Sequence, residues 1–436
     1  MQTMIGISKP IQKQREDNSQ ILSDQFLPNL QEIHDYSLEK LKEDNSQILS
    51  EQLILSLQEL YEFFLQSLKD DYLQNSSNKL LLNLKKINEN FLEELKQIEV
   101  NSVNTRNFTQ RDIRFIDLFA GIGGFHFALD QLGFHCVFAS EIDQKARETY
   151  QYNLQEISPN LFIGEPVDQI DLFNTDITKI DPINIPDHDI LCGGFPCQPF
   201  SIAGYRQGLQ DQGRGDLIFQ IVKILQVKKP VAFFLENVKN LYSHNQGKTY
   251  QIIEKLLESA GYYVKAKVLN TMEYGNLPQN RERLYIVGFR HKKHWQNFDF
   301  PEPAQLIIKF TDLLEAKVDD YFYYNNKPLY SQLKTEITKF DTVYQWRRKY
   351  VRENKKGVCP TLTANMGTGG HNVPLIRDKK GIRKLTPTEC LRLQGFPANF
   401  QFPTNMSISH QYKQVGNAVS ITVVRRIAEN IKKVLE

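Results

Sequence analysis

The pattern that most constrains the fold begins with an apolar segment, Phe115–Leu118, which runs into the glycine-rich turn FAGIGG at residues 119–124. A second apolar segment, Cys136–Ser140, follows after a helix-length interval and ends at Glu141. Short apolar runs that flank a glycine-rich turn and a helix are typical of a strand–helix–strand unit. The order strand, turn, helix, strand and acid therefore predicts an α/β fold.

The same segments predict the kind of ligand. Glycines let a ligand approach the backbone closely, and a carboxylate at the end of the second strand can accept hydrogen bonds from ribose hydroxyls. The turn lacks the full dinucleotide spacing and carries no phosphate-binding lysine. A nucleoside ligand without a pyrophosphate therefore fits better than a dinucleotide, and S-adenosylmethionine is the obvious candidate.

A second stretch has the features of a presented nucleophile. The apolar segment Asp189–Cys192 leads into the sequence GGFPCQPFS at residues 193–201. The glycine pair lets the backbone turn sharply, and Pro196 fixes φ and stiffens that turn. We expect this arrangement to present Cys197 at the open end of a sheet. The alternative is a buried structural cysteine beside a tight turn, since free cysteines are usually buried and inert.

Together these segments resemble the DNA (cytosine-5-)-methyltransferase family, in its prokaryotic restriction-modification form. Further motifs follow in that family's order: NTDI at 174–177, FFLENV at 233–238, QNRER at 279–283, RKLTPTECLRLQGFP at 383–397 and QVGNAV at 414–419. The resemblance covers roughly residues 113–436. It implies a Rossmann-like S-adenosylmethionine-dependent methyltransferase domain with a mostly parallel sheet, and a smaller target recognition domain.

The motif order also implies where the domains begin and end. Residues 113–292 correspond to the first part of the catalytic domain, 293–382 to the target recognition domain, and 383–436 to the C-terminal part of the catalytic domain. Residues 1–100 precede the resemblance as an all-α extension, and the polar residues 101–112 form a linker.

The resemblance assigns a reaction and its catalytic groups. The enzyme is expected to transfer a methyl group to C5 of a flipped-out cytosine in double-stranded DNA, with Cys197 forming a covalent bond to C6. Glu236, after an apolar strand, is expected to contact the N3 edge of the base, although a cap at a strand end is a simpler role. Arg281 and Arg283 alternate along a strand and so face opposite ways. By resemblance Arg281 points at the base, and Arg283 is more supportive.

The resemblance also assigns binding residues, beginning with the cofactor pocket: Phe119, Gly121, Ile122, Gly123, Gly124, Glu141, Ile142, Asp176, Ile177, Pro196, Leu217, Asn417 and Ala418. For Asp176 alone, an Asx-turn is a fair alternative. The residues expected to contact DNA lie on the segment after the nucleophile, in the QNRER motif and in the recognition region: Gln198, Ser201, Arg214, Arg283, Arg347, Arg348, Arg352 and Thr363. For the basic run around Arg347, the alternative is a solvated face.

Charge and cysteine usage agree with a nucleic-acid enzyme of the bacterial cytoplasm, associated with the nucleoid. Residues 1–110 carry 11 Lys and Arg against 17 Asp and Glu, whereas the remainder carries 42 against 34. The basic excess thus lies with the motifs and suits a polyanionic substrate, although many inert proteins carry as much. The five cysteines are scattered and suggest no zinc site, and no signal peptide or membrane span is expected.

The N-terminal hundred residues contain a repeat. EDNSQILS at residues 16–23 recurs at 43–50, and a degenerate third copy begins at Leu68. Apolar residues recur at helical spacing, but a shift of 27 residues turns the apolar stripe roughly half a turn out of phase. We therefore expect separate helices. They either bind a protein partner or self-associate, or they simply cover the catalytic domain. Their acidity argues against DNA binding.

Two other functions remain open on the sequence alone. A relative of the family methylates cytosine in tRNA with the same core motifs, but it lacks a recognition region of about ninety residues such as the one between Arg290 and Arg383. A non-catalytic DNA- or cofactor-binding regulator is the second alternative. The presence of both Cys197 and Glu236 argues against it.

Overall fold

The computed structural model describes residues 112–163, 171–196, 217–347, 349–354, 357–367 and 374–436. The chain divides into two units, residues 1–110 and 111–436, and the described residues belong to the second. The expected N-terminal helices and nearly all of the expected linker therefore lie outside the described residues. Within the described part of the chain, no helix is long and apolar enough to cross a membrane.

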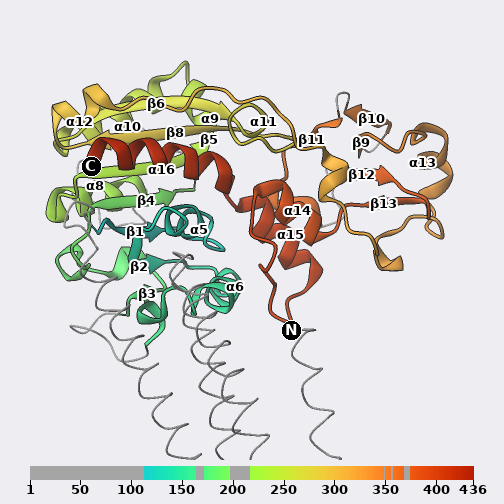
Figure 1. The fold of residues 1–436 in the computed structure, drawn as a ribbon, viewed down its shortest axis with the longest axis horizontal. Coiled ribbons are helices and arrows are strands. Elements are labelled where there is room, and N and C mark those ends of the chain that lie inside the picture. The colour runs from blue at the N-terminus through green and yellow to red at the C-terminus, as the bar shows by residue number, and fades with distance from the viewer. Residues whose placement is uncertain (1–111, 164–170, 197–216, 348, 355–356, 368–373) are drawn as a thin grey trace, which may run out of the picture. The chain divides into compact units, whose positions relative to one another are not determined.

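A seven-stranded sheet forms the centre of the second unit (Figure 1). In spatial order its strands are β3 (Phe173–Asn174), β2 (His135–Ser140), β1 (Arg114–Leu118), β4 (Ile190–Gly194), β5 (Ala232–Val238), β8 (Glu282–Phe289) and β6 (Tyr263–Asn270). The first five are parallel, whereas β8 runs antiparallel to β5 and β6. The predicted α/β fold with a mostly parallel sheet is confirmed.

The strand order locates a binding crevice. From β1 the chain moves outward to β2 and β3, and then returns to place β4 on the other side of β1. In open α/β sheets, ligands bind outside the carboxyl ends of the strands where the order reverses in this way. The crevice is therefore expected beyond the ends of β1 and β4.

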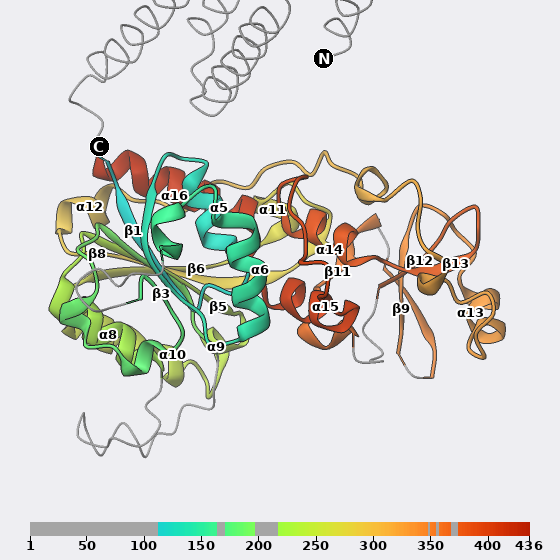
Figure 2. The same ribbon diagram turned by 90° about the horizontal axis from the view of Figure 1, so that it is seen from below.

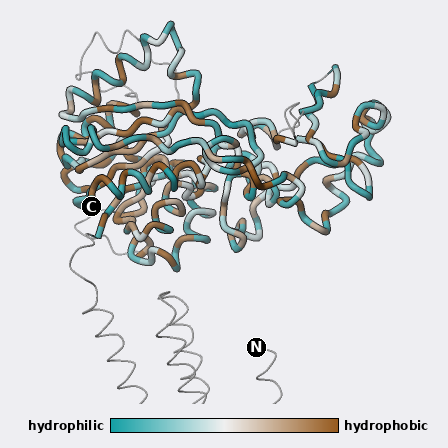
Figure 3. Tube along the Cα trace, turned by 45° about the horizontal axis from the view of Figure 1, so that its top comes forward, coloured by the Kyte–Doolittle hydropathy of each residue, from teal (hydrophilic) through white to brown (hydrophobic). Residues whose placement is uncertain are grey.

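Helices cover both faces of the sheet (Figure 2). Successive side chains of a strand point to opposite faces, so each strand contributes to both layers. In β1, Phe115 packs into the hydrophobic cluster on one face, and Ile116 and Leu118 pack into the cluster on the other. The first face is covered by α5 (Gly124–Asp130), α6 (Gln144–Leu154) and α16 (Ile421–Leu435), and the second by α8 (Leu217–Lys228), α9 (Asn240–Ser243) and α10 (Lys248–Ser259). Figure 3 shows hydrophobic residues recurring along the strands between these layers.

Local sequence explains how two of the helices begin. Asp143 caps α6, because its side chain accepts hydrogen bonds from the backbone N–H groups of Lys145 and Ala146. The LTPTE motif forms a capping box at the start of α14 (Pro387–Gln394), in which Thr386 and Glu389 satisfy each other's backbone N–H groups. Arg383 then binds both carboxylate oxygens of Glu389 at 2.8 Å.

A smaller sheet lies beside the larger one (Figure 1). Its antiparallel strands, in spatial order, are β10 (Val351–Asn354), β9 (Val343–Trp346), β12 (Pro374–Arg377) and β13 (Ile382–Lys384), with α13 (Tyr330–Glu336) nearby. A separate parallel pair, β7 (Gln279–Asn280) and β11 (Cys359–Pro360), lies between the two parts. The remaining helices are α11 (Thr271–Tyr274), α12 (Lys292–Asn297) and α15 (Ile408–Asn417).

Residues 293–382, the predicted recognition region, include nearly all of the smaller sheet. The first residues of this region form most of α12, which packs on β6 and β8 of the larger sheet. At the other end, β13 continues to Lys384. The hydrophobic cluster on one face of the larger sheet also includes Tyr344 and Ile376 of the smaller sheet. One continuous core therefore joins the two parts.

Candidate active site at the carboxyl ends of the parallel strands

A cavity of about 840 Å³ lies where the strand order predicts it. Its walls come from the segments just after β1 to β5, from β8 and from α15. Most of the expected cofactor residues line this cavity: Phe119, Gly121, Ile122, Glu141, Ile142, Asp176, Ile177, Pro196, Leu217 and Asn417. The other three, Gly123, Gly124 and Ala418, are not among the described lining residues.

The glycine-rich turn makes one wall of the cavity. Phe119, Gly121 and Gly123 all have positive φ, at 55°, 57° and 87°. A Cβ at Gly121 would meet nothing within 4 Å, so the backbone there faces open space. The Gly121 N–H donates to the Oε2 atom of Glu141 over 2.8 Å. The turn thus offers a ligand an open backbone surface and is fixed by the carboxylate that follows β2.

The next two glycines have a packing role. A Cβ at Gly123 would lie 2.5 Å from the Leu154 side chain, and one at Gly124 would lie 2.6 Å from the Val419 side chain. These distances are too short for non-bonded carbon atoms, so a side chain at either position would displace its neighbour. The glycines let α5 approach α6 and the segment before α16.

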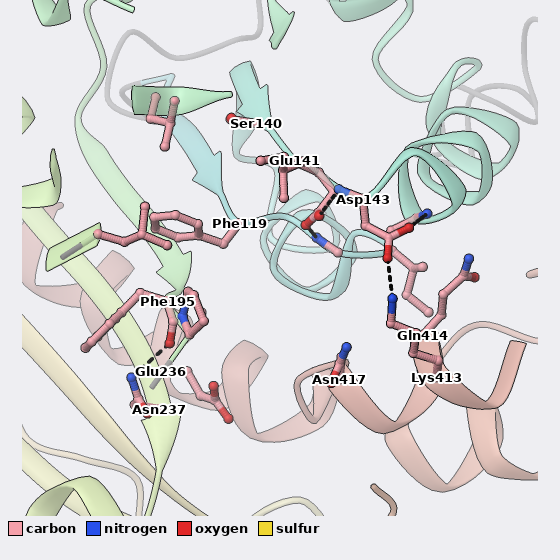
Figure 4. A pocket seen from close by; sticks show the side chains of 18 of the residues that line it. Phe119, Ser140, Glu141, Asp143, Phe195, Glu236, Asn237, Lys413, Gln414 and Asn417 are labelled. Carbon is pink, nitrogen blue, oxygen red and sulfur yellow. Dashed lines mark hydrogen bonds and ion pairs between the residues drawn. The ribbon is translucent and has the colours of Figure 1, made fainter. Parts of the chain in front are cut away.

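Glu141 is held from two sides. Its Oε1 atom accepts a hydrogen bond from the Asp143 N–H over 2.7 Å, opposite the bond from Gly121 (Figure 4). Burial raises the pKa of Glu141 above its ordinary value, and the backbone hydrogen bonds oppose that shift. The neighbouring Ile142 is 69% exposed and lines the cavity. A carboxylate and an exposed apolar side chain thus stand together at the end of β2.

The Asp176 side chain combines a local role with a place at the cavity wall. Its Oδ1 atom accepts from the backbone N–H of Thr178 over 3.1 Å and from the Thr178 hydroxyl over 2.7 Å. These hydrogen bonds lower the pKa of Asp176, against a smaller effect of burial. The Asx-type cap is therefore present, and Asp176 also lines the cavity.

Helix α15 closes the cavity on the side of α6. Lys413 donates to Oδ2 of Asp143 over 2.6 Å, and the Gln414 side chain bonds to Thr149 and to the Lys145 carbonyl. Figure 4 shows this ion pair beside Asn417. Hydrogen bonds therefore join α15 to the segment that follows β2. The sequence did not predict the contact between Lys413 and Asp143.

Glu236 and Arg283 form an ion pair on the opposite wall. The register of the parallel strands places Glu236 of β5 beside Gly194 of β4, and antiparallel pairing places Arg283 of β8 beside Val238. The Arg283 Nε atom lies 3.0 Å from Oε1 of Glu236. Burial raises the pKa of Glu236, while Arg283 and Arg281 oppose that shift. The arrangement can hold a carboxyl group that keeps its proton to higher pH than an exposed glutamate.

The backbone leading to the expected nucleophile is fastened to the same wall. The Asn237 side chain donates to the Phe195 carbonyl over 2.9 Å (Figure 4). A Cβ at Gly194 would lie 3.6 Å from Oε2 of Glu236. Pro196 lines the cavity, whereas Cys197 and the following residues to 216 lie outside the described residues.

Arg281 is more deeply buried than Arg283 and makes different contacts. Its Nη1 atom donates to the Leu362 carbonyl over 2.9 Å, and its Nη2 atom donates to the carbonyls of Gly416 and Ala418 over 3.3 and 2.7 Å. Burial, with the nearby Arg283 charge, lowers the pKa of Arg281 to about 9. These contacts place Arg283, and not Arg281, beside Glu236. They favour a structural role for Arg281, which is the reverse of the roles expected from the sequence.

Arg281 belongs to a network that joins three distant motifs. The Gln279 side chain donates to the Leu393 carbonyl and to Gln394 Oε1, and it accepts from the Leu362 N–H. The Gln394 side chain in turn donates to the carbonyls of Val415 and Ala418. The QNRER, QGFP and QVGNAV motifs are therefore locked together by buried hydrogen bonds.

The residues expected to contact DNA fall into three groups, and one of these is Arg283 alone, at the wall of the large cavity. Gln198, Ser201, Arg214 and Arg348 lie outside the described residues. Arg347, Arg352 and Thr363 line a second cavity of about 660 Å³ between the smaller sheet and the β7–β11 pair. In the described part of the chain, no cluster of three or more His, Cys, Asp or Glu residues could hold a metal ion.

Comparisons with known proteins were made for the whole chain. Residues 113–433 match the family model of C-5 cytosine-specific DNA methylases. The Type II methyltransferase M.Bsp6I of Bacillus sp. (strain RFL6) is 49% identical over 326 residues, which cover 74% of this chain and 99% of that relative. The Type II methyltransferase M.HhaI of Haemophilus parahaemolyticus is 39% identical over 334 residues, covering 73% and 94%.

Solved structures with low sequence identity share the fold. A methyltransferase of Entamoeba histolytica, EhMeth, has a TM-score of 0.56 and 16% identity, covering 75% of this chain and all of that one. The Dnmt2 methyltransferase of S. pombe has a TM-score of 0.56 and 19% identity, covering 74% and 99%. These likenesses support the fold described above.

Proposed function

Because this chain belongs to the C-5 cytosine-specific DNA methylase family, and is thereby a DNA (cytosine-5-)-methyltransferase, we propose a mechanism that assigns the chemistry to its own residues. In this mechanism Cys197 attacks C6 of a cytosine in a specific short sequence of double-stranded DNA. The Glu236–Arg283 pair at the wall of the large cavity is the observation on which the proposal rests.

The residues of the large cavity fit S-adenosylmethionine. The Glu141 carboxylate, fixed by two backbone N–H groups, can accept hydrogen bonds from ribose hydroxyls. The exposed Ile142 can cover an adenine ring, and Asp176 and Asn417 offer polar groups at the wall. When bound, S-adenosylmethionine supplies the electrophilic methyl group that cytosine C5 takes up.

Cys197 prepares the base for this transfer. Its thiolate adds to C6, and the electron pair of the C5–C6 double bond becomes available at C5. After methylation the proton on C5 leaves, the double bond re-forms and the bond from sulfur to C6 breaks, which regenerates the thiolate. Consecutive Cα atoms are about 3.8 Å apart, so Cys197 lies at most about 7.6 Å of chain from Phe195. The chain length thus permits Cys197 to reach the base held at Glu236.

Glu236 stabilises the base during this addition. In its protonated form, the carboxyl can donate a hydrogen bond to N3, where negative charge develops. Arg283 contacts the Oε1 atom of Glu236. The Oε2 atom, which lies on the side of Gly194, remains available to the base. We assign Arg283, rather than Arg281, as the cation nearest the base. Arg281 fixes the wall through its three carbonyl contacts.

The target base must leave the helix before it can reach this wall, because C6 is inaccessible inside a stacked duplex. We propose that Gln198, Ser201 and Arg214 contact the DNA around the flipped base and that the smaller sheet reads the surrounding sequence. Since relatives such as M.Bsp6I are named Type II methyltransferases, we also propose that this enzyme is the modification partner of a restriction endonuclease.

A trapping experiment tests the mechanism. Duplex DNA with 5-fluorocytosine at the mapped target, incubated with S-adenosylmethionine, should yield a covalent protein–DNA complex, because fluorine cannot leave as the proton does. The cross-link should map to Cys197. An enzyme that methylates ordinary duplexes but forms no such complex contradicts the covalent mechanism. Parallel assays on tRNA distinguish the alternative substrate, for which methylation of tRNA and not of duplex DNA would be decisive.

A further inference from the structure

Residues that are adjacent in the sequence line the two cavities. Arg281 lines the large cavity, and the preceding residue, Asn280, lines the second. Leu362, whose carbonyl accepts from Arg281, likewise stands between Thr361 and Thr363, which both line the second cavity. Neighbouring Cα atoms are about 3.8 Å apart and stacked bases about 3.4 Å apart. The two cavities are therefore neighbours, which would allow DNA whose cytosine occupies the large cavity to extend to the second.

One face of the β9–β10 hairpin forms part of this second cavity. Gln345 lies on β9, directly opposite Arg352 on β10, and both line the cavity. The residues on either side of Gln345, Tyr344 and Trp346, pack into the hydrophobic core. Because successive side chains of a strand point to opposite faces, the amide of Gln345 faces the cavity.

Gln345 differs from Asn280, Thr361 and Thr363, three other polar residues of this wall. The Asn280 side chain already accepts from Asn270, and the hydroxyls of Thr361 and Thr363 donate to Asn280 and Asn365. Gln345 is only 5% exposed, yet its amide makes no hydrogen bond to any residue that the structure describes. An amide that lines a cavity and has no hydrogen-bond partner in the described part of the chain can take up a polar group of a ligand.

We propose that Gln345 reads the major-groove edge of a purine next to the target cytosine. This inference rests on the proposed function and specifies how its substrate is recognised. A two-stranded ribbon can enter the major groove, where an amide can donate to the N7 atom that both purines present. Arg347 and Arg352 supply positive charge on the same wall and suit the polyanion. The uncharged amide suits a base edge rather than a phosphate.

The experiment uses the full-length enzyme and duplexes in which each position around the mapped cytosine is varied in turn. At one position the wild type should prefer a purine, and Gln345→Leu should reduce that preference by about 10-fold to 100-fold. Gln345→Glu should shift the same position toward cytosine, whose N4 amine can donate to a carboxylate. The control Gln332→Leu, on an exposed face of α13 away from the cavity, should keep the wild-type preferences.

The outcomes separate the possible failures. Binding of S-adenosylmethionine with wild-type affinity shows that each variant is folded. A folded Gln345→Leu or Gln345→Glu variant with unchanged base preferences overturns the inference. A uniform loss on all sequences, with a shallower salt dependence, also overturns it, because that pattern belongs to a phosphate contact. If the wild type methylates no duplex DNA, the proposed function fails first and the inference fails with it.

Discussion

The two cavities of this enzyme differ in how their polar groups are held. In the large cavity, both oxygens of Glu141 accept backbone hydrogen bonds, and Arg281 donates to three carbonyls. In the second cavity, the side chains of Gln345 and Arg352 make no hydrogen bond to the described residues. The hydrogen bonds in the large cavity fix the positions of these groups, whereas the Gln345 and Arg352 side chains have no such bonds and are available to a ligand. The comparison supports fixed chemistry in the first cavity and the proposed reading of the DNA sequence in the second.

A substitution of a residue that lines the large cavity would contradict this comparison if it changed the recognised DNA sequence. The largest effect is expected for Cys197→Ser, because an alcohol is a far weaker nucleophile than a thiolate. We expect methylation to fall by at least about 10³-fold while duplex binding survives. The measurement is methyl transfer alongside DNA binding, with Cys136→Ser as the matched control. Substantial turnover by Cys197→Ser would falsify the nucleophile assignment.

The next effect is expected for Glu236→Gln, which removes the acidic proton but keeps the size of the side chain. The methylation rate should fall by about 10²-fold to 10⁴-fold, with the recognised sequence unchanged. The control is Glu282→Gln. Glu282 is half-buried, pairs with Lys239 and is not among the described lining residues of the large cavity, so this change should have little effect.

The pH dependence sharpens the same assignment. Burial raises the pKa of Glu236, so its protonated form persists to higher pH than that of an exposed glutamate. If that proton is required, the rate is full below the raised pKa and declines as pH rises through it. The decline should be absent in Glu236→Gln. A Glu236→Gln profile that keeps the wild-type alkaline decline would assign it to another group.

A smaller effect, on stability, should separate the two arginines of the motif. Arg281→Lys loses the planar fork that reaches three carbonyls and should lower the free energy of unfolding by roughly 3 kcal/mol. Arg283→Lys should lower the methylation rate more than the stability. Urea unfolding measures the difference, with Arg290→Lys, which loses a single exposed carbonyl contact, as the control. If Arg281→Lys is as stable as the wild type, the structural role assigned to Arg281 is wrong.

The smallest effect is expected from removing the N-terminal extension. A chain starting near Asn107 retains the whole second unit, so we expect the same recognised sequence and most of the activity per site. Loss of solubility or a changed association state is compatible with this, because apolar residues such as Leu53 and Phe64 need a covering surface. Sequencing of the methylated sites decides the matter, and a changed recognition sequence would show that the repeats help to read DNA.

Much of the large cavity could be predicted from the sequence, because its groups follow strand ends. Glu141 and Glu236 come directly after or at the end of apolar runs, and the structure places both at the cavity wall. The contacts of Arg281 and Arg283 could not be predicted in the same way. Because successive side chains of a strand alternate, Arg281 and Arg283 point to opposite faces. Which of the two lies beside Glu236 depends on how β8 pairs with β5. The end of β13 at Lys384 likewise depends on its pairing with β12, which the sequence does not specify.

By itself, the sequence determined the α/β class, the glycine-rich turn, the acid after the second strand and the family. These features are local, because each depends on residue types within a few positions of one another. Only the tertiary structure decided that Lys413 pairs with Asp143, that Gln279, Gln394 and Arg281 lock three motifs together, and that Gln345 faces a cavity without a partner. Such contacts join residues far apart in the chain. Their formation depends on strand register and helix packing, which no local pattern encodes.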